Sequence, residues 1–457
     1  MRPRTASRNQ AMKSLRLLRA DAARIWTAAL QAVEPEGAVR KMVRRDGHIL
    51  QLGGRRYDLD KIRKVWVLGA GKAAAPMGRA VERILGRYLA GGFLVTKYGH
   101  RMDLGRLEIM EAGHPLPDSN SMASAARIAA LAKDQIDARD LVICLFSGGA
   151  SSLLVCPAPG ITLADKLACT RMLLDAGADI HEMNAVRKHL SAIKGGGLAR
   201  MLAPAHAVSL ILSDVVGDDV GTIASGPMAP DPTTFAECVE VFDRLGLSDK
   251  MPPAVKQRLE SGAAGEIPET PKQGDPVFQE GRTMIVGSSA RACAAASQAA
   301  RKLGYKALVL TSRLEGDNGE AARFHMSIAG EIVHHRRPLR LPACIISGGE
   351  TTVRITGKGK GGRNQEFALH CARPLAQLPA ACLVASIGTD GTDGPTDAAG
   401  AIADSTTLLR SMKYGASFLK DSLDNNDSYR FFRRLGDLII TGPTRTNVMD
   451  LHILLVG

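Results

Sequence analysis

The chain has 457 residues, of which 45% are hydrophobic and 23% charged, a balance typical of a globular protein with two or three domains. No apolar run approaches the roughly 18 residues that a membrane helix needs, so we expect a soluble protein with no membrane partner. The formal net charge is +13, but only 4% of the residues are aromatic and no nucleic-acid-binding motif occurs, which favours anionic small molecules over nucleic acid as partners.

The basic excess is concentrated at the N-terminus, where residues 1–46 carry eleven Lys or Arg against four Asp or Glu. We expect residues 1–17 to form a flexible basic leader. A mitochondrial transit peptide is the alternative, because the first nineteen residues hold six basic side chains and no acid. The next segment predicts an amphipathic helix, since apolar residues share one face: Leu15, Leu18, Ala22, Ile25, Ala29 and Val33.

Strands and helices then alternate over residues 18–250, which predicts a first domain. The expected strands are continuous apolar runs, "KVWVLGA", "GGFLVTKYG", "DLVICLFS" and "AVSLILS", separated by helical patterns. Such runs are typical of a parallel sheet that is covered on both faces. The fold class predicted here is therefore α/β, with a Rossmann-like parallel sheet and helices on both faces.

Residues 251–282 are rich in proline, glycine and charge, and they predict a linker. A second α/β domain is expected over residues 283–457, starting with the strand "RTMIVGSS". Its last strands lack full helical crossovers, which predicts a mixed sheet. The eight cysteines are scattered and form no CxxC pair, so neither a zinc site nor a disulfide scaffold is predicted, and a reducing, cytoplasmic compartment is favoured.

Apolar strands in both halves end in turns rich in Gly, Ser, Asp or Thr. These turns are Gly69–Lys72, Ser147–Ser152, Ser213–Asp219, Ser347–Glu350, Gly388–Asp397 and Gly442–Asn447. Ligands of open α/β sheets bind beyond the carboxyl ends of the strands. Three turns in each half therefore predict one active site in a cleft between the two domains.

The turn "GAGKAA" fits the dinucleotide pattern G-x-G-x-x-A, but the next strand ends in Thr96-Lys97-Tyr98-Gly99, without an acid for a ribose hydroxyl. An alternative is that Lys72 acts as a positive charge at a helix N-terminus, a position that favours anions. A solvated lysine is the plain structural interpretation. The turn "SGGASS" is not the G-x-S-x-G of a serine hydrolase, and a backbone anion cradle is favoured.

Further cations and acids surround these turns. Arg187, Lys188 and Lys194 stand beside a triple glycine and suit a carboxylate or phosphate, unless they lie on a surface helix. Carboxylates at strand ends could hold Mg²⁺ or could simply form turns: Asp214, Asp218, Asp219, Asp390, Asp393 and Asp397. Basic groups, glycine turns and acids without a cysteine, histidine or serine nucleophile match the needs of phosphoryl transfer.

The stretch "GKGKGGRNQE" is not a P-loop, because glycine follows both Lys358 and Lys360. We expect its glycines to let the backbone approach phosphate, with Arg363 supplying a bidentate fork. The two lysines are expected to support this role or to be solvated.

Several long motifs in one order resemble the class II glycerate 2-kinases, a family with an N-terminal glycerate-kinase domain and a C-terminal MOFRL domain. The motifs are "GAGKAA", "SGGASSLL", "NAVRKHLSAIKGGGLAR", "SDVVGDDVGTIASGP", "SGGETTVRITGKGKGGRNQEFAL", "GTDGTDGPTDAAGA" and "TGPTRTNV". The chain looks close to the bacterial members of the family that were once labelled hydroxypyruvate reductases. The resemblance implies ATP- and Mg²⁺-dependent phosphorylation of D-glycerate at the 2-hydroxyl, giving 2-phosphoglycerate, by a monomer or homodimer.

By this resemblance, Lys72 and Arg363 fall on the catalytic lysine and arginine of the family. We add Asp214 as a catalytic or metal-binding acid, with Asp390 and Asp393 as further metal candidates. The predicted substrate- and ATP-binding residues are Gly69, Gly71, Ser147, Gly148, Gly149, Asn184, Arg187, Lys188, Ser347, Gly348, Gly349, Glu350, Asn364 and Asn447. Arg445 departs from the family pattern, in which glycine is more usual at this position.

Two other functions are compatible with parts of the sequence. An NAD(P)H-dependent hydroxypyruvate reductase would use "GAGKAA", but the ribose-binding acid and a histidine–carboxylate proton donor are lacking. A non-enzymatic, anion-binding regulatory protein would suit the basic leader, but it gives no role to the carboxylates beside the glycine turns.

Overall fold

The computed structural model describes the backbone of residues 4–457 and the side chains from residue 14 onward. The chain folds into two compact units. One unit, Pro35–Val286, is called the parallel-sheet unit here. The other combines the residues up to Glu34 with Gly287–Gly457 and is called the mixed-sheet unit.

The parallel-sheet unit is built on a six-stranded sheet whose order is β6 (Leu107–Ala112), β5 (Leu89–Lys97), β4 (Val65–Ala70), β7 (Leu141–Ser147), β8 (His206–Leu212) and β9 (Arg282–Gly287). The pairings from β6 to β8 are all parallel. Every residue of β4 and β7 is buried, as their continuous apolar sequences predict. Four helices accompany the sheet: α3 (Ala74–Leu85), α4 (Ser119–Asp134), α5 (Ala150–Leu153) and α8 (Gly197–Leu202).

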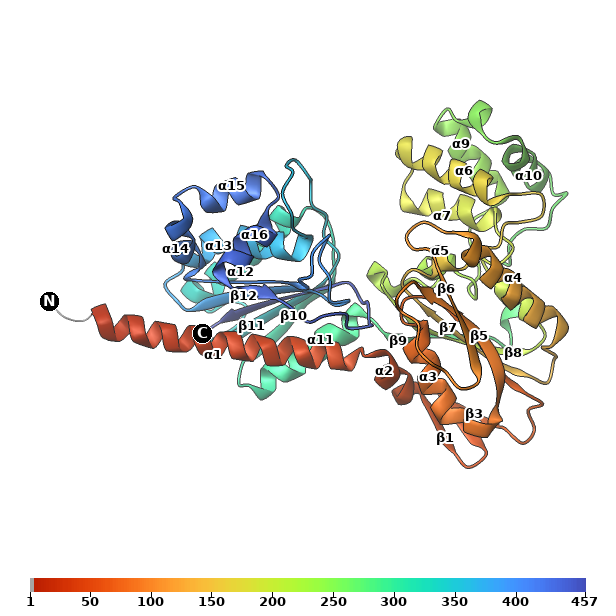
Figure 1. Cartoon of the computed structure of the whole chain (residues 1–457), viewed down its shortest axis with the longest axis horizontal. Coiled ribbons are helices and arrows are strands. Elements are labelled where there is room, and N and C mark those ends of the chain that lie inside the picture. Colours follow the sequence, from red (N-terminus) through yellow and green to blue (C-terminus); the bar gives the residue numbers. More distant parts are fainter. Residues whose placement is uncertain (1–3) are drawn as a thin grey trace. The chain divides into compact units, whose positions relative to one another are not determined.

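A group of four further helices forms a lobe of the same unit (Figure 1), made of α6 (Leu163–Asp175), α7 (Ile180–His189), α9 (Phe235–Arg244) and α10 (Pro253–Ala263). The helices α6, α7 and α9 each begin with a capping box, at Thr162, Asp179 and Thr234. Phe235 and Phe242 are buried at the centre of the lobe. The short helix α2 (Pro35–Met42) and a three-stranded antiparallel sheet complete the unit, with strands β1 (Val43–Asp46), β2 (Ile49–Leu52) and β3 (Arg55–Asp58).

The mixed-sheet unit has six strands in the order β10 (Lys306–Leu314), β11 (Ala343–Gly349), β15 (Asp450–Val456), β12 (Cys382–Gly388), β13 (Gly400–Asp404) and β14 (Leu438–Ile439). The pair β10–β11 is parallel and the other pairs are antiparallel, which confirms the predicted mixed sheet. Two helices, α1 (Arg4–Ala32) and α11 (Ser289–Lys302), cover one face of this sheet (Figure 1). The other face carries α12 (Asn318–His335), α13 (Arg363–Gln377), α14 (Thr407–Ser411), α15 (Phe418–Asp424) and α16 (Ser428–Leu435).

The structure divides the chain at other positions than the sequence predicted. The first helix belongs to the mixed-sheet unit, where Ile25 is fully buried and the Tyr305 hydroxyl donates to Asp21 at 2.9 Å. The strand β9, expected to open the second domain, instead extends the parallel sheet. The expected linker contains α10, whose Leu259 is buried in the helical lobe. Local patterns identified these elements, but long-range packing decides which unit each one joins.

The predicted flexible leader is largely helical, because α1 begins at Arg4; residues 1–3 lie outside the described residues. Among the described residues, no helix combines the length and the apolar character that crossing a membrane requires. Short 3₁₀ turns connect the larger elements at Gly86–Tyr88, Val216–Asp218, Ile223–Ser225, Ser248–Lys250, Pro276–Phe278 and Met412–Tyr414.

Candidate functional site

In the parallel-sheet unit, three of the predicted turns lie at the same edge of the sheet. Strands β4, β7 and β8 are neighbours and run in parallel, with Ala70 opposite Phe146 and Ser147 opposite Leu212. The turns that follow them therefore gather at their carboxyl ends. This edge carries Lys72, Ser147–Gly149 and Asp214.

The Lys72 turn is braced by the neighbouring turn at the end of β7. The Ser147 hydroxyl accepts a hydrogen bond from the Ala73 amide at 2.9 Å, and the Lys72 amide donates to the Gly148 carbonyl at 2.9 Å. Gly71 has φ +138°, and a Cβ atom there would lie 2.1 Å from Ser147 Oγ, so the close approach requires glycine. Ser147 thus fixes the turn that presents Lys72, which is half-buried just before α3.

The other glycines of these two turns serve packing. Gly69 lies within β4, where a Cβ atom would meet the Leu145 carbonyl at 2.2 Å. Gly149 has φ +85°, and a Cβ atom there would lie 2.7 Å from Cδ2 of His114. The His114 ring therefore packs against the predicted anion cradle.

Helix α7 carries two neighbouring cations with different surroundings. Lys188 is buried, and its Nζ donates to Asp231 Oδ1 at 3.1 Å. Burial alone would raise the pKa of Asp231, but Lys188 and the Thr233 hydroxyl lower it overall. Arg187 is half-buried, and burial lowers the pKa of its guanidinium. Asn184 is buried on the same helix.

The acids after β8 differ in their roles. Asp214 is half-buried directly beyond the strand. Asp219 accepts from the Thr222 hydroxyl at 2.6 Å and from the Gly221 amide at 3.2 Å, which makes it a turn-forming residue. Asp218 adopts φ +60°, a left-handed conformation that aspartate tolerates better than most residues.

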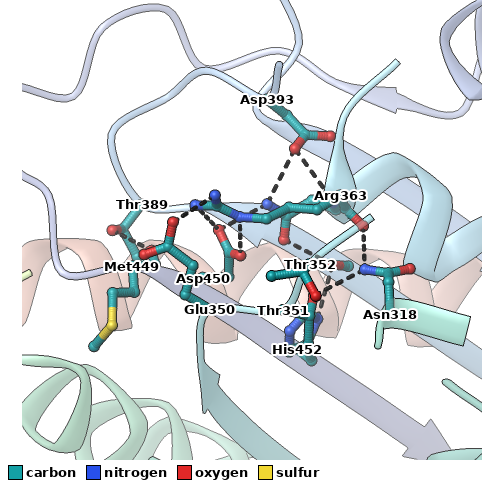
Figure 2. A network of polar contacts seen from close by, with 12 residues as sticks. Asn318, Glu350, Thr351, Thr352, Arg363, Thr389, Asp393, Met449, Asp450 and His452 are labelled. Carbon is teal, nitrogen blue, oxygen red and sulfur yellow. Dashed lines mark hydrogen bonds and ion pairs between the residues drawn. The ribbon is translucent and has the colours of Figure 1, made fainter. Parts of the chain in front are cut away.

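In the mixed-sheet unit, Arg363 is the first residue of α13 and lies in a network of acids (Figure 2). Its Nε donates to Asp450 Oδ2 at 2.5 Å and its Nη2 to Oδ1 at 3.2 Å, while Nη1 donates to Glu350 Oε1 at 2.6 Å. Burial lowers the pKa of Arg363, but Asp450 and Glu350 raise it overall. The guanidinium is therefore charged and held by a bidentate pair.

Asp450 was not predicted as a site residue. It is the first residue of β15, where it pairs with Gly349 at the end of β11 and Gly388 at the end of β12. It is fully buried, and burial raises the pKa of its carboxyl group to about 7. Arg363 and Asn364 lower this pKa, but burial has the larger effect. The signal in the sequence is a single acid at the head of the apolar run "DLHILLV".

Two of the predicted metal ligands have distinct environments in this unit. Asp393 accepts from the amides of Asn364 at 3.0 Å and Gln365 at 2.8 Å, so both of its carboxylate oxygens cap the start of α13. Burial raises the pKa of Asp393 overall, although the hydrogen bonds from Asn364 and Gln365 lower it. Asp390 is half-buried, and its Oδ1 accepts from the Thr392 amide and hydroxyl, each at 3.0 Å.

The glycine-rich stretch before Arg363 packs against another loop. The amides of Gly357, Lys358 and Lys360 donate to side chains of the loop Asn425–Asp427, at 2.9, 3.0 and 3.2 Å. A Cβ atom on Gly359 would lie 2.4 Å from the backbone oxygen of Asn425. The Gly359 amide also donates to the Asn425 carbonyl at 2.8 Å, so the expectation that this stretch offers its amides to phosphate is wrong for the four amides of residues 357–360.

The remaining predicted residues of this unit lie at the end of β11 and in the segment just before β15. The Ser347 hydroxyl is 2.8 Å from Nε2 of the buried His325. Gly348 faces Ser289 and Cys293, and Gly349 has φ +146° beside the Leu314 backbone. Asn447 Oδ1 accepts from the Met449 amide at 3.2 Å. Arg445 adopts φ +62°, the left-handed conformation that favours glycine, in line with the departure noted in the sequence.

Within the residues whose side chains are described, one group of three metal-type side chains has its ligand atoms within 4.8 Å of one another, namely His48, Asp58 and Asp60. Within their own units, neither Asp214 nor Asp390 and Asp393 belong to such a group. Exposed acidic groups are common without a metal, so the small cluster by itself does not indicate a site.

Comparison with known proteins gives matches over most of the chain. Residues 21–260 match a family described as a domain of unknown function, DUF4147, and residues 343–450 match the MOFRL family. A glycerate 2-kinase of Pyrococcus horikoshii is 41% identical over 95% of this chain and 96% of its own. A protein of Agrobacterium vitis, provisionally named hydroxypyruvate reductase, is 44% identical over 86% of this chain and 87% of its own. The crystal structure of a glycerate kinase from Thermotoga maritima superposes with a TM-score of 0.86 at 38% identity, covering 97% of this chain and all of that one.

Proposed function

Because this chain belongs to the glycerate 2-kinase family, with a DUF4147 domain followed by a MOFRL domain, we propose that it transfers the γ-phosphoryl group of ATP to the 2-hydroxyl of D-glycerate. The products are 2-phosphoglycerate, ADP and a proton. The observation that carries the proposal is the 41% identity to a glycerate 2-kinase over nearly the full length of both chains.

Lys72 is proposed to stabilise the charge of the transferring phosphoryl group. Its ammonium group follows a parallel strand and precedes α3, where the positive end of the helix dipole also favours anions. The bracing of the turn by Ser147 and Gly148 supports this role, because a preorganised charge costs no reorganisation during the reaction.

Arg363 is proposed to act on the same phosphoryl group or on the nucleotide phosphates. Asp450 and Glu350 hold its guanidinium in a defined orientation, and 36% of its side chain remains exposed. The two acids also share its charge, so we expect Arg363 to act more through oriented hydrogen bonds than through net positive charge.

The surroundings of the predicted acids can be compared with the ligands that Mg²⁺ prefers. Asp214 and Asp390 are half-buried carboxylates at strand ends, which is the hard oxygen chemistry that Mg²⁺ takes, and we propose them as the residues that would hold it. Asp393 does not fit, because both of its oxygens accept from the start of α13. The ion would neutralise charge on the nucleotide phosphates.

The reductase alternative draws on the turn "GAGKAA" and on the name of the Agrobacterium vitis relative. An NAD-type site needs an acid at the end of the following strand, but β5 ends at Lys97 and is followed by Tyr98 and Gly99. The kinase assignment is therefore the better supported of the two.

Two parallel assays test the proposal. The protein is supplied with D-glycerate, ATP and Mg²⁺ in one, and with hydroxypyruvate and NADPH in the other. We expect ADP only in the first, with the phosphoryl group located on the 2-oxygen by ³¹P–¹H correlation spectroscopy. Nicotinamide oxidation in the second assay without ADP in the first would refute the kinase.

Two further predictions accompany this proposal. A cytoplasmic location is supported by the cysteines, all eight of which are free, as a reducing compartment would keep them. A monomer or homodimer stays the prediction for the oligomeric state, and light scattering would test it.

A further inference from the structure

The parallel-sheet unit contains a cavity of about 350 Å³ close to the carboxyl edge of its sheet. Its volume is at the lower end of the range of small-molecule sites, which is about 300–1,000 Å³. The polar and charged side chains that line it include His114, Ser151, Lys166, Arg187 and Lys194. Three of these five are cations.

The two lysines bond to neutral oxygen atoms. Lys194 Nζ donates to the Ser151 carbonyl at 2.9 Å and to the Ser151 hydroxyl at 2.6 Å. Lys166 Nζ donates to the carbonyls of Leu190 at 2.8 Å and Arg187 at 3.3 Å, at the end of α7. Lys194 is 4% exposed and Lys166 is 9% exposed.

No carboxylate among the described side chains compensates this positive charge. Among the residues from 14 onward, no Asp or Glu forms an ion pair with Lys166, Arg187 or Lys194. The neighbouring Lys188 shows the usual solution for a buried cation, because it pairs with Asp231. Buried charge without a counter-charge is unfavourable, so the three cations gain free energy when an anion enters their cavity.

The pKa values of the two lysines reflect the same excess of buried positive charge. Burial is the largest cause that lowers the pKa of Lys194, and the charges of Lys166 and Arg187 add to it. Burial likewise lowers the pKa of Lys166 to about 7. A bound anion would raise both values again, because it favours the charged forms.

His114 connects the cavity to the Ser147–Gly149 turn, which braces Lys72. Its ring lines the cavity and packs against Gly149. Burial lowers the pKa of His114 to about 4, and the charge of Lys72 is the next largest cause, so the ring is neutral near pH 7. A neutral imidazole leaves one ring nitrogen to donate and one to accept a hydrogen bond.

We propose that this cavity binds the carboxylate of the phosphoryl acceptor, with Arg187 and Lys194 as its ligands and Lys166 as a further cation. The proposal rests on the proposed function for the identity of the acceptor, a small 2-hydroxy acid. It also separates the two cations of α7: Arg187 recognises substrate, whereas Lys188 holds Asp231. His114, whose ring also lines the cavity, would then lie beside the bound acid.

The primary test is calorimetric titration of D-glycerate into wild type, Arg187→Met and Arg171→Met, without nucleotide. Arg171 lies exposed on α6, the helix that also carries Lys166, and it does not line the cavity, so it is a matched control for the loss of one positive charge. We expect Arg187→Met to weaken glycerate binding about 10- to 100-fold, the usual effect of losing a charged hydrogen bond. Arg171→Met should bind as wild type does.

A neutral analogue isolates the carboxylate. Glyceramide carries an amide where glycerate has its charge, so wild type and Arg187→Met should bind it equally weakly. In steady-state assays, Arg187→Met and Lys194→Met should raise the KM for D-glycerate while the KM for ATP stays within about 2-fold. Circular dichroism of Lys194→Met checks that this buried substitution preserves the fold.

The outcomes separate this inference from the proposed function. If wild type forms ADP from ATP and D-glycerate while Arg187→Met keeps the wild-type glycerate affinity, the carboxylate site is overturned and the kinase stands. If wild type binds D-glycerate in an Arg187-dependent way but forms no ADP, the site stands and the kinase is overturned. An equal loss of glycerate and ATP binding in Arg187→Met would also overturn the carboxylate assignment.

Discussion

At the scale of single residues, Arg187 and Lys188 form a natural test pair, because they are adjacent cations with different partners. Lys188→Met would leave the Asp231 carboxylate buried without its ion-pair partner. We expect this change to lower the free energy of unfolding by about 3 kcal/mol, as breaking a buried pair usually does. Arg187→Met should lower the free energy of unfolding by less than about 1 kcal/mol, because removing this half-buried side chain leaves no buried carboxylate without a partner.

Urea denaturation of the two variants beside wild type measures both values. Glycerate binding should show the reverse order, with the larger loss in Arg187→Met. Equal losses of stability in the two variants would contradict the different roles given to these side chains.

The sequence predicts Lys72 and Arg363 as site residues, but it does not predict the side chains that hold them. Lys72 and Arg363 stand in recognisable motifs, whereas Asp450 is one acid at the start of an apolar strand. It becomes a partner of Arg363 only because β15 inserts between β11 and β12. Lys166 was missed for the same reason: its cavity is formed by segments that are distant in sequence.

At the scale of the element, the turn before Arg363 is predicted to be a packing element. Gly359→Ala places a Cβ atom 2.4 Å from the Asn425 backbone oxygen and 2.5 Å from Asp427 Cβ. We expect the variant to lose about 1–3 kcal/mol of stability, the usual effect of overpacking. If the glycines instead served phosphate, nucleotide affinity would fall while thermal stability stayed unchanged.

Gly330→Ala is the matched control for this substitution. Gly330 lies inside α12, and nothing lies within 4 Å of the added Cβ atom. Alanine is the better helix former, so this variant should be more stable than wild type by about 0.5–1 kcal/mol. Opposite signs in thermal unfolding of the two glycine variants would support the packing interpretation.

The segment between β6 and α4 carries His114 and gives a prediction about pH. The pKa of His114 is about 4 in the folded protein, whereas its ordinary value is 6.5. Between these values the unfolded chain binds more protons, so stability contributed by neutral His114 is lost as the pH falls from about 6.5 to 4. His114→Gln should therefore lose less stability than wild type between pH 7 and pH 5.

Chemical denaturation at the two pH values tests this difference. An identical loss in wild type and His114→Gln would mean that other groups dominate the acid sensitivity.

Most elements were predictable because their patterns are local. The buried strands β4 and β7 are apolar throughout, and capped helices follow recognisable motifs. The small sheet of β1–β3 was missed, since strands such as "VRRD" and "RRYD" are mostly charged and carry no apolar run. The sheet that β9 joins depends on a pairing with β8 that no local pattern specifies.

At the scale of the whole molecule, the two units bring different charges to the proposed reaction. The parallel-sheet unit supplies Lys72 and the three cations of the cavity. The mixed-sheet unit supplies Arg363 together with Glu350 and Asp450. An active site shared by the two units stays a prediction. Substituting Lys72 and Arg363, one residue from each unit, singly and together tests it.

We expect Lys72→Ala and Arg363→Lys each to lower kcat by about 10²-fold or more. Arg363→Lys keeps a charge near Asp450 but loses the bidentate fork. If both residues act in one chemical step, the kcat of the double variant should be much higher than the value expected from multiplying the two single losses. Single-turnover kinetics measures this, and fully multiplicative losses would contradict joint action.

The mixed-sheet unit combines helix α1 with segments that follow the parallel-sheet unit in the sequence, and this order has a consequence for biosynthesis. Helix α1 is synthesised before the parallel-sheet unit, yet the α11 and β15 surfaces that cover its apolar stripe are made after that entire unit. At typical translation speeds this delay is roughly 10 to 50 s. The nascent helix then exposes Leu18, Ile25 and Val33 to solvent for that time. Because β15 lies between β11 and β12, a chain truncated before Asp450 would leave these two strands without the partner that joins them.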